Sequence, residues 1–159
     1  MLTKSVKSFA KINIALCIKS RREDGYHELD TIMVPVEFHD TLLIDELKTG
    51  VENYVTIDDF KDGIVKYNLV SDCLEAMAKK YNFNQKFRVY IHKNIPMQAG
   101  LGGGSSNAAA AMKAINSILK INASEDELVE IAKNHGADIP FFVKNGAKRC
   151  NGIGEVMRP

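Results

Sequence analysis

The segment that decides the fold runs Ile95-Pro-Met-Gln-Ala-Gly-Leu-Gly-Gly-Gly-Ser-Ser-Asn-Ala-Ala-Ala-Ala111. Its glycines allow the backbone to adopt positive φ and to approach a ligand closely. The alanines that follow favour a helix, which we predict over about residues 105–119. A loop that opens directly into a helix presents free backbone N–H groups and the positive end of the helix dipole, and both attract anions. The segment therefore predicts a phosphate-binding loop.

Two common kinds of phosphate-binding loop are excluded or disfavoured, because the segment lacks residues that they need. It is not a Walker A loop, because it contains no lysine and no Gly-Lys-Ser/Thr step. It is a poor dinucleotide-binding loop, because the third glycine of that pattern is missing. Ser105 and Ser106 supply hydroxyls that suit phosphate oxygens or Mg²⁺. The alternative is a flexible loop in which Ser105, Ser106 or Asn107 only caps the helix.

Two residues outside the loop could serve phosphoryl transfer, which needs charge neutralisation and a group that deprotonates the acceptor hydroxyl. Lys11 lies beside Asn13 on the polar face of a strand predicted over residues 10–18, and its alternative is a solvated strand face. Asp138 lies among apolar residues in the segment Gly136-Ala-Asp-Ile-Pro-Phe-Phe142. Asp138 is either the N-cap of the next helical turn or functional.

The histidines predict no metal held by the protein alone. None of the four shows the spacing of zinc ligands along a helix. His27 follows Asp24-Gly-Tyr and suits a turn as well as a contact with a base. Tyr26 suits packing as well as a ligand platform. The residue context alone leaves the roles of both open.

Composition limits the class of protein without giving its function. The 159 residues suit one domain, and 21 basic against 20 acidic side chains exclude a polybasic nucleic-acid binder. Cys17, Cys73 and Cys150 show no CxxC spacing, which predicts reduced thiols. Lys11 and Asn13 interrupt the apolar N-terminal stretch, so neither a signal peptide nor a membrane span is expected. We therefore expect a cytoplasmic protein with no membrane partner.

Hydrophobic periodicity places strands early in the chain and helices later. Strands are expected over residues 10–18, 30–38, 41–47, 54–58 and 86–93, and helices over 69–81 and 105–119. The first strand is expected to be half-buried, with one apolar face made of Ala10, Ile12, Ile14, Leu16 and Ile18. A capping box that starts at Ser124 opens a further helix. This order predicts an α+β fold in one unit over residues 1–159.

Four ordered segments resemble the GHMP kinases, the superfamily of galactokinase and of homoserine, mevalonate and phosphomevalonate kinases. They are Ala10-Lys-Ile-Asn-Ile-Ala-Leu16, Arg22-Glu-Asp-Gly-Tyr-His-Glu-Leu29, Pro96-Met-Gln-Ala-Gly-Leu-Gly-Gly-Gly-Ser-Ser-Asn-Ala-Ala109 and Gly136-Ala-Asp-Ile-Pro-Phe-Phe142. The Gly-Gly-Gly-Ser-Ser and Gly-Tyr-His patterns resemble one branch, which phosphorylates the 2-hydroxyl of 4-diphosphocytidyl-2-C-methyl-D-erythritol in the non-mevalonate isoprenoid pathway. The resemblance implies an ATP-dependent small-molecule kinase whose first domain is like domain 2 of ribosomal protein S5.

The resemblance also implies roles for individual residues. Asp138 matches the catalytic base toward the substrate hydroxyl, and Lys11 matches the lysine that stabilises that oxygen and the transferring phosphoryl group. Asn13, Tyr26 and His27 match substrate contacts, the last two beside the cytosine. The residues implied for ATP, with Ser106 also a contact of Mg²⁺, are Asn68, Pro96, Gln98, Ala99, Gly100, Leu101, Gly102, Gly103, Gly104, Ser105, Ser106 and Asn107.

Two departures from the family pattern shape what we expect. Gln98 stands where this branch usually has glycine, so the loop is expected to differ locally. The family carries a second, C-terminal domain that completes the cytidyl pocket, whereas Pro159 falls where the first domain ends. We therefore expect a domain that lacks the C-terminal GHMP domain. The alternatives are a non-catalytic nucleotide-binding fragment and a GHMP kinase for another small alcohol, and the sequence does not determine the oligomeric state.

Overall fold

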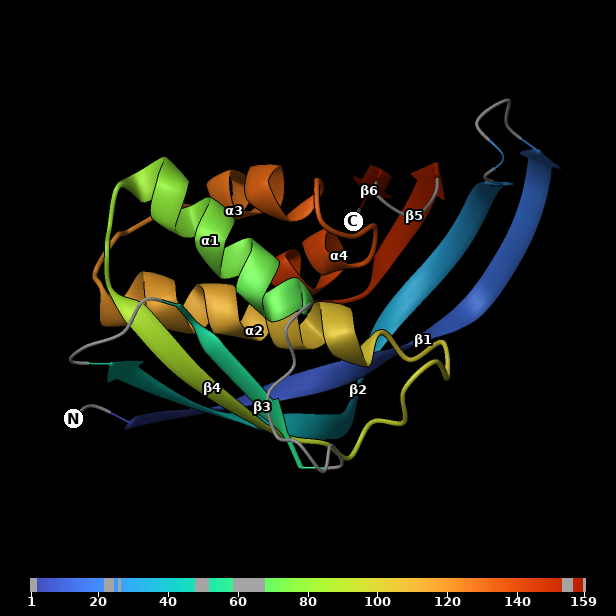
Figure 1. The fold of residues 1–159 in the computed structure, drawn as a ribbon. Helices are drawn as coiled ribbons and strands as arrows, with labels where there is room; N and C mark the ends of the chain where they lie inside the picture. Colours follow the sequence, from blue (N-terminus) through green and yellow to red (C-terminus); the bar gives the residue numbers. More distant parts are fainter. Residues whose placement is uncertain are drawn as a thin grey trace.

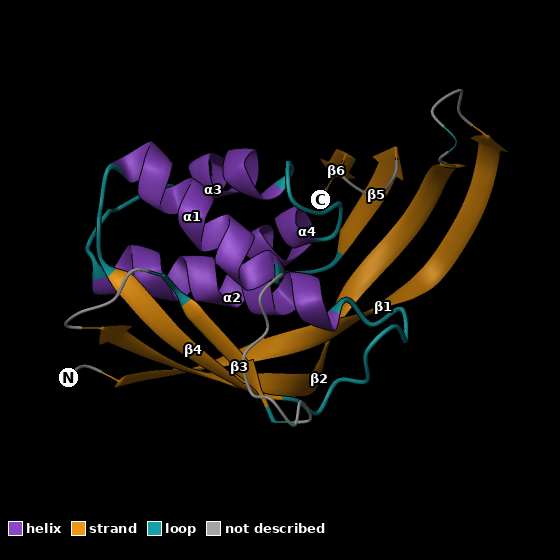
Figure 2. Cartoon of the chain, viewed as in Figure 1, coloured by secondary structure: helices purple, strands orange, loops and turns teal. Residues whose placement is uncertain are grey.

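The computed structural model describes residues 3–21, 25, 27–47, 52–58, 68–152 and 156–158. Within these residues, six strands form one sheet and four helices accompany it. The helices gather on one face of the sheet, while β1 (Thr3–Arg21) and β2 (His27–Leu47) continue past them as an extended arm (Figure 1). Figure 2 shows the same separation of a helical layer from a strand layer. The expected α+β fold is confirmed.

The long strand β2 organises the sheet. β1 pairs with it antiparallel along one edge, from Thr3 opposite Asp45 to Arg21 opposite His27. The other edge is shared by β4 (Lys86–His92), which pairs with residues 41–47, and β5 (Lys148–Gly152), which pairs with residues 29–33. β3 (Tyr54–Ile57) joins β4 in parallel, and β6 (Val156–Arg158) joins β5 antiparallel. The strands expected over residues 30–38 and 41–47 are one strand, because the irregularity between them is a register shift and not an end.

The helices follow the expected pattern closely in the middle of the chain. α1 (Leu69–Tyr81) has the predicted bounds, α2 (Gly103–Ile118) starts slightly earlier than predicted, and α3 (Glu125–Ala132) has the predicted capping box at Ser124. The alternation in β4 is also confirmed, with Phe87, Val89 and Ile91 buried against the helices. The short helix α4 (Ile139–Lys144) and the strands β5 and β6 were not expected, because each is too short to show a period.

The expectation of one buried apolar face on β1 is wrong. Ile14, Leu16 and Ile18 are 61%, 58% and 60% exposed. A register shift between Asn13 and Ala15 also changes which side each residue faces. Ile12 pairs with Val34, whereas Leu16 pairs with Thr31, three residues away on β2 and therefore on the opposite face. The arm thus carries apolar side chains on both faces, and alternation alone could not reveal this.

The three cysteines are free, as expected. Cys17 is exposed, whereas Cys73 and Cys150 are buried. Burial raises the pKa of the Cys73 thiol to about 12, with a smaller effect from the charge of Asp72. In the described residues, no helix combines the length and the apolar character that crossing a membrane requires.

Ion pairs connect β1, β2 and β5 within the arm. Arg149 donates two hydrogen bonds to the Asp30 carboxylate, of 2.8 and 2.7 Å, and Lys19 Nζ lies 3.1 Å from the same group. These partners, Arg149 first and then Lys19, hold the pKa of Asp30 well below its usual range. A carboxyl group with a depressed pKa stabilises the fold above its unfolded pKa, and this contribution is lost as the pH falls through the folded pKa.

We expect Asp30→Asn to lower the melting temperature at pH 7 and to have a progressively smaller effect below about pH 4, where the unfolded carboxyl group is protonated. Thermal unfolding followed by circular dichroism over pH 2–8 measures the difference. Glu37→Gln on the same strand is the control, since Glu37 is an exposed acid outside this cluster. A difference between Asp30→Asn and wild type that is constant across this range contradicts the assignment.

Candidate active site

The glycine-rich loop ends at the N-terminus of α2. Gly102 is the N-cap residue, with φ of 70°, and its carbonyl accepts the first helical bond from Ser106 N at 2.8 Å. Ser105, Ser106 and Asn107 lie inside the helix, and no side chain caps it. The alternative that one of these three only caps the helix is therefore wrong. The first backbone N–H groups of α2 have no partner within the helix and can bind an anion.

A pocket of about 350 Å³ lies between this loop, α1 and the end of β4. Its volume is within the range of sites for small ligands. Every residue predicted for nucleotide binding except Ser106 lines it, together with Met97 from the same loop and with Ile57, Leu69 and Lys93, which the sequence reasoning missed. The lining residues are Ile57, Asn68, Leu69, Lys93, Pro96, Met97, Gln98, Ala99, Gly100, Leu101, Gly102, Gly103, Gly104, Ser105 and Asn107.

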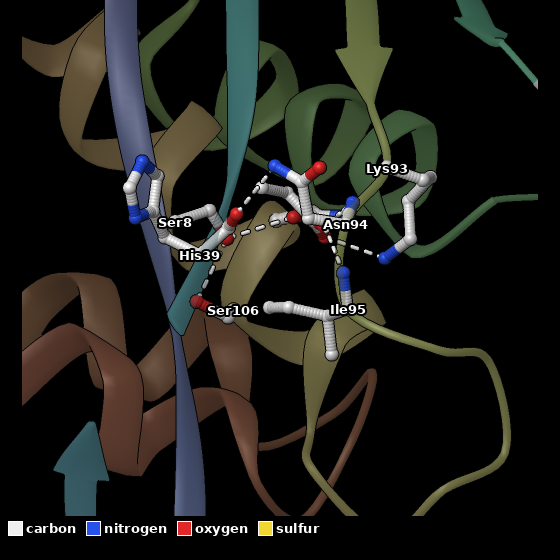
Figure 3. A network of polar contacts seen from close by, with 8 residues as sticks. Ser8, His39, Lys93, Asn94, Ile95 and Ser106 are labelled. Atoms are coloured by element: carbon white, nitrogen blue, oxygen red, sulfur yellow. Dashed lines mark hydrogen bonds and ion pairs between the residues drawn. The ribbon is translucent and has the colours of Figure 1, made fainter. Parts of the chain in front are cut away.

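Ser106 is placed differently from its prediction as a magnesium contact. Its hydroxyl is buried and hydrogen-bonded to Ser8 on β1 at 2.8 Å (Figure 3), and Ser8 also donates to Asn107 Oδ1 at 2.7 Å. Consecutive helical residues point about 100° apart, so Ser105 faces the pocket while Ser106 faces the sheet. In this structure the Ser106 hydroxyl connects α2 to β1 and does not line the pocket.

Lys93 is the cation that the loop itself lacks. It follows the end of β4, and its Nζ would lie 3.0 Å from a Cβ placed on Gly103, at the first turn of α2. Its ammonium is paired with the carboxylate of Asp40, and both side chains are buried. The available signal was a lysine two residues before Ile95, where the strand pattern ends. Distance along the sequence hid the contact, because Gly103 comes ten residues later.

A second polar cluster lies on β1 and at the start of α4. Lys11 Nζ donates to Asn13 Oδ1 at 2.6 Å and lies 3.7 Å from Asp138 Oδ2. Asn13 Nδ2 in turn donates to Thr31 Oγ1 at 2.7 Å. The solvated alternative for Lys11 is wrong, because its side chain is only 8% exposed. The capping alternative for Asp138 is also wrong, because its side chain makes no cap hydrogen bond to α4.

The two clusters are joined through backbone and ring contacts. Lys11 N donates to the carbonyl of Leu101 at 3.0 Å, so β1 holds the end of the loop. A Cβ on Gly102 would lie 2.8 Å from the ring of Phe142, so the chain passes directly over α4. Lys113 on α2 donates to the carbonyl of Phe142 at 3.0 Å, and burial lowers the pKa of this lysine. The loop, the lysine and the aspartate are therefore held in one rigid arrangement.

The thiol of Cys150 is buried close enough to this cluster to feel the charges of Lys11 and Asp138. Burial raises its pKa, the charge of Asp138 raises it further, and Lys11 and Lys148 oppose that rise. A protonated thiol is a weak nucleophile and ligand.

The structure does not bring every predicted residue to this site. His27 is exposed at the start of β2, opposite Arg21 at the far end of the arm. Tyr26 lies outside the described residues. Gln98 has φ of 58°, the left-handed conformation that glycine adopts freely, so the backbone keeps a glycine-like turn at this position.

Comparisons with known proteins point to one family. The family described as GHMP kinases N terminal domain matches residues 68–146. A 4-diphosphocytidyl-2-C-methyl-D-erythritol kinase from Caldicellulosiruptor bescii is 40% identical over 152 residues, which are 96% of this chain and 53% of that protein. The enzyme of the same name from Acetivibrio thermocellus is 37% identical over 153 residues, again 96% of this chain and 53% of that protein. The chain thus spans about half the length of these relatives.

The solved structures agree with the sequence comparisons. A crystal structure of 4-(cytidine 5'-diphospho)-2C-methyl-D-erythritol kinase matches with a TM-score of 0.81 and 30% identity, over 98% of this chain and 55% of that one. The mevalonate kinase of Methanococcus jannaschii shares the fold, with a TM-score of 0.74 at 14% identity, over 99% of this chain and 55% of that one. The glycine loop, the Lys11–Asp138 pair and these likenesses lead to one conclusion. The chain belongs to the GHMP kinases and has the fold of their N-terminal domain.

Proposed function

We propose that residues 1–159 form the nucleotide-binding, N-terminal domain of a kinase that phosphorylates the 2-hydroxyl of 4-diphosphocytidyl-2-C-methyl-D-erythritol with ATP. The observation that carries the proposal is the Lys11–Asp138 pair, 3.7 Å apart and hydrogen-bonded through Lys11 N to the end of the phosphate loop. An acceptor hydroxyl beside Asp138 is then close to the phosphates that the loop would hold. The relatives named for this reaction support the choice of substrate.

In this mechanism Asp138 accepts the proton of the attacking hydroxyl. Its carboxylate makes no capping bond and is 31% exposed, so it is accessible to a substrate while remaining fixed by Lys11. Lys11 stabilises negative charge on the oxygen and on the transferring phosphoryl group. Asn13 holds the Lys11 ammonium at 2.6 Å and is itself held by Thr31, which keeps the lysine pre-organised.

The nucleotide would lie in the 350 Å³ pocket with its phosphates at the first turn of α2. A polyphosphate fits this turn, because the positive ends of its backbone N–H groups and the Lys93 ammonium lie together beside Gly103. Mg²⁺ bound to ATP would neutralise the phosphates during transfer. Ser105 is the hydroxyl that faces the pocket, and Ser106 would reach the ion only after leaving Ser8.

We further propose that the natural partner is a small molecule in the cytoplasm, not a nucleic acid or a membrane. The near balance of 21 basic and 20 acidic residues fits this assignment. By their match to the family's Gly-Tyr-His pattern, Tyr26 and His27 are the residues we propose for contact with the cytosine.

Coupled detection of ADP tests the proposal on two proteins. One is this chain, and the other is this chain joined to the second half of the Caldicellulosiruptor bescii relative, which supplies the length that this chain does not span. We expect the joined protein to release ADP only when the diphosphocytidyl substrate is present. Isothermal titration with a non-hydrolysable ATP analogue and Mg²⁺ should show binding to both proteins.

The outcomes separate the alternatives. Release of ADP with mevalonate or homoserine, and none with the diphosphocytidyl compound, would replace the substrate assignment with another small alcohol. Nucleotide binding by the joined protein without turnover on any acceptor would identify a non-catalytic binding domain. Absence of nucleotide binding by both proteins would overturn the kinase proposal itself.

A further inference from the structure

A buried carboxylate lies beneath the start of the phosphate loop and has no part in the mechanism above. Asp40 is in the middle of β2 and is completely buried. Its Oδ1 accepts hydrogen bonds from the backbone N–H groups of Asn94 and Ile95, both at 2.8 Å, and its Oδ2 accepts from Lys93 Nζ. Figure 3 shows these three consecutive residues gathered at the point where the chain leaves β4. The Asp40 side chain thus accepts hydrogen bonds from three consecutive residues of the chain.

This contact fixes the entry to the loop. β4 ends at His92, so the N–H groups of residues 94 and 95 have left the sheet ladder, and Asp40 replaces the strand as their acceptor. Asn94 Nδ2 also donates to the carbonyl of His39 at 3.0 Å, next to Asp40. The exit of the loop is held separately, by Lys11 N at Leu101 and by Ser8 at Ser106 and Asn107. The exposed turn around Gln98 is therefore held at its start by Asp40 on β2 and at its end by Lys11 and Ser8 on β1.

The charge of Asp40 is also placed to balance Lys93. The Lys93 ammonium lies beside Gly103, at the positive end of the α2 dipole, where a cation is unfavourable on its own. A buried ammonium needs a charged partner, and Asp40 supplies it from below the loop. The side of Lys93 toward the pocket then remains able to meet an anion, because Lys93 also lines that pocket.

We propose that Asp40 is a positioning residue for nucleotide binding. Its carboxylate sets where the phosphate loop begins and holds Lys93 at the first turn of α2, without touching the nucleotide. The identity of the ligand in this inference rests on the proposed function. The hydrogen bonds of Asp40 are observed independently of that function.

Two double variants isolate the acceptor role of Asp40 from its charge. Asp40→Asn/Lys93→Met removes both buried charges and keeps an oxygen for the two backbone N–H groups. Asp40→Ala/Lys93→Met removes the same charges and the acceptor as well. Both lack Lys93, so any difference between them belongs to the loop anchor. Affinity for a non-hydrolysable ATP analogue with Mg²⁺ is measured by titration calorimetry, and protection of the amides of residues 94 and 95 is measured by hydrogen exchange.

We expect the alanine form to bind at least tenfold more weakly than the asparagine form and to exchange both amides at least tenfold faster. Met77→Ala, a core truncation in α1, controls for general loss of stability and should change affinity less than threefold. If the alanine form does not fold, Asp40→Gln/Lys93→Met replaces it, since the longer side chain displaces the acceptor.

Equal affinities and equal exchange rates in the two double variants would overturn the positioning role. Faster exchange in the alanine form with unchanged affinity would also overturn it, because the anchor would then be merely structural. If the wild-type chain binds no nucleotide while the two double variants still differ in amide exchange, the proposed function is overturned. The hydrogen bonds from Asp40 to the start of the loop would then stand as a structural anchor only.

Discussion

Asp138→Asn is expected to lower phosphoryl transfer by about 10³-fold and to leave nucleotide affinity within about threefold, within the usual range for loss of a general base. The amide has the shape of the carboxylate but cannot take the proton of the substrate hydroxyl. The Lys11 ammonium would keep its hydrogen bond to Asn13, so the local structure should persist. Asp138 is absent from the lining of the pocket where we propose that the nucleotide binds, which is why binding should survive.

The measurement is single-turnover transfer from ATP to the diphosphocytidyl substrate by the protein joined to a second domain. Asp126→Asn is a matched control, because Asp126 is an exposed aspartate on neighbouring α3 whose partner is Lys144. That variant should retain full transfer. An Asp138→Asn protein that transfers at more than a tenth of the wild-type rate would remove Asp138 from the proposed role of base.

Gly102→Ala is expected to destabilise the fold by about 2–5 kcal/mol and to weaken nucleotide binding at least tenfold. A side chain at φ of 70° costs about 1–2 kcal/mol. The new Cβ would also lie 2.8 Å from the ring of Phe142 and 3.2 Å from Cγ of Lys11, and relieving such overpacking costs about 1–3 kcal/mol. The ring cannot yield freely, since it packs edge-on against Phe141 at 5.1 Å. The first turn of α2 should therefore shift away from the phosphates.

Urea unfolding and titration with the ATP analogue measure the two effects. Gly25→Ala is the matched control, because Gly25 has φ of 86° and a Cβ there would meet no atom within 4 Å. Gly25→Ala should lower the free energy of unfolding only by the cost of placing a side chain at positive φ, about 1–2 kcal/mol, and should bind the ATP analogue with unchanged affinity. If Gly102→Ala behaves like Gly25→Ala in both measurements, the close passage of the loop over α4 has no energetic consequence.

Much of the central fold could be predicted from local pattern. The period of residues 69–81 predicted α1 with the observed bounds, and the Ser124 capping box was found where expected. These succeed because each signal and its partner lie within one turn or one strand. The arm could not be predicted in the same way, since the register shift beside Ile14 changes the face of the residues that follow it, as far as the next shift after Ile18.

The residues that line the pocket were largely predictable, because most of them belong to one continuous segment, residues 96–105. Lys93 and Asp40 were missed because their roles depend on a contact between β2 and the end of β4, 53 residues apart. The contact of Ser106 with Ser8 was not predictable, because only the position of β1 shows which of two adjacent serines faces the pocket.

The sequence by itself determined that a glycine-rich loop opens a helix here, since positive φ and helix propensity are local properties of the chain. It also supplied both open alternatives for Lys11 and Asp138. Only the tertiary structure excluded the solvated strand face and the helix cap, by burying Lys11 and placing it 3.7 Å from a carboxylate that makes no cap hydrogen bond to α4. The physical reason is that the environment of a charge depends on distance through space. Lys11 and Asp138 are 127 positions apart in the sequence, and the fold makes them neighbours.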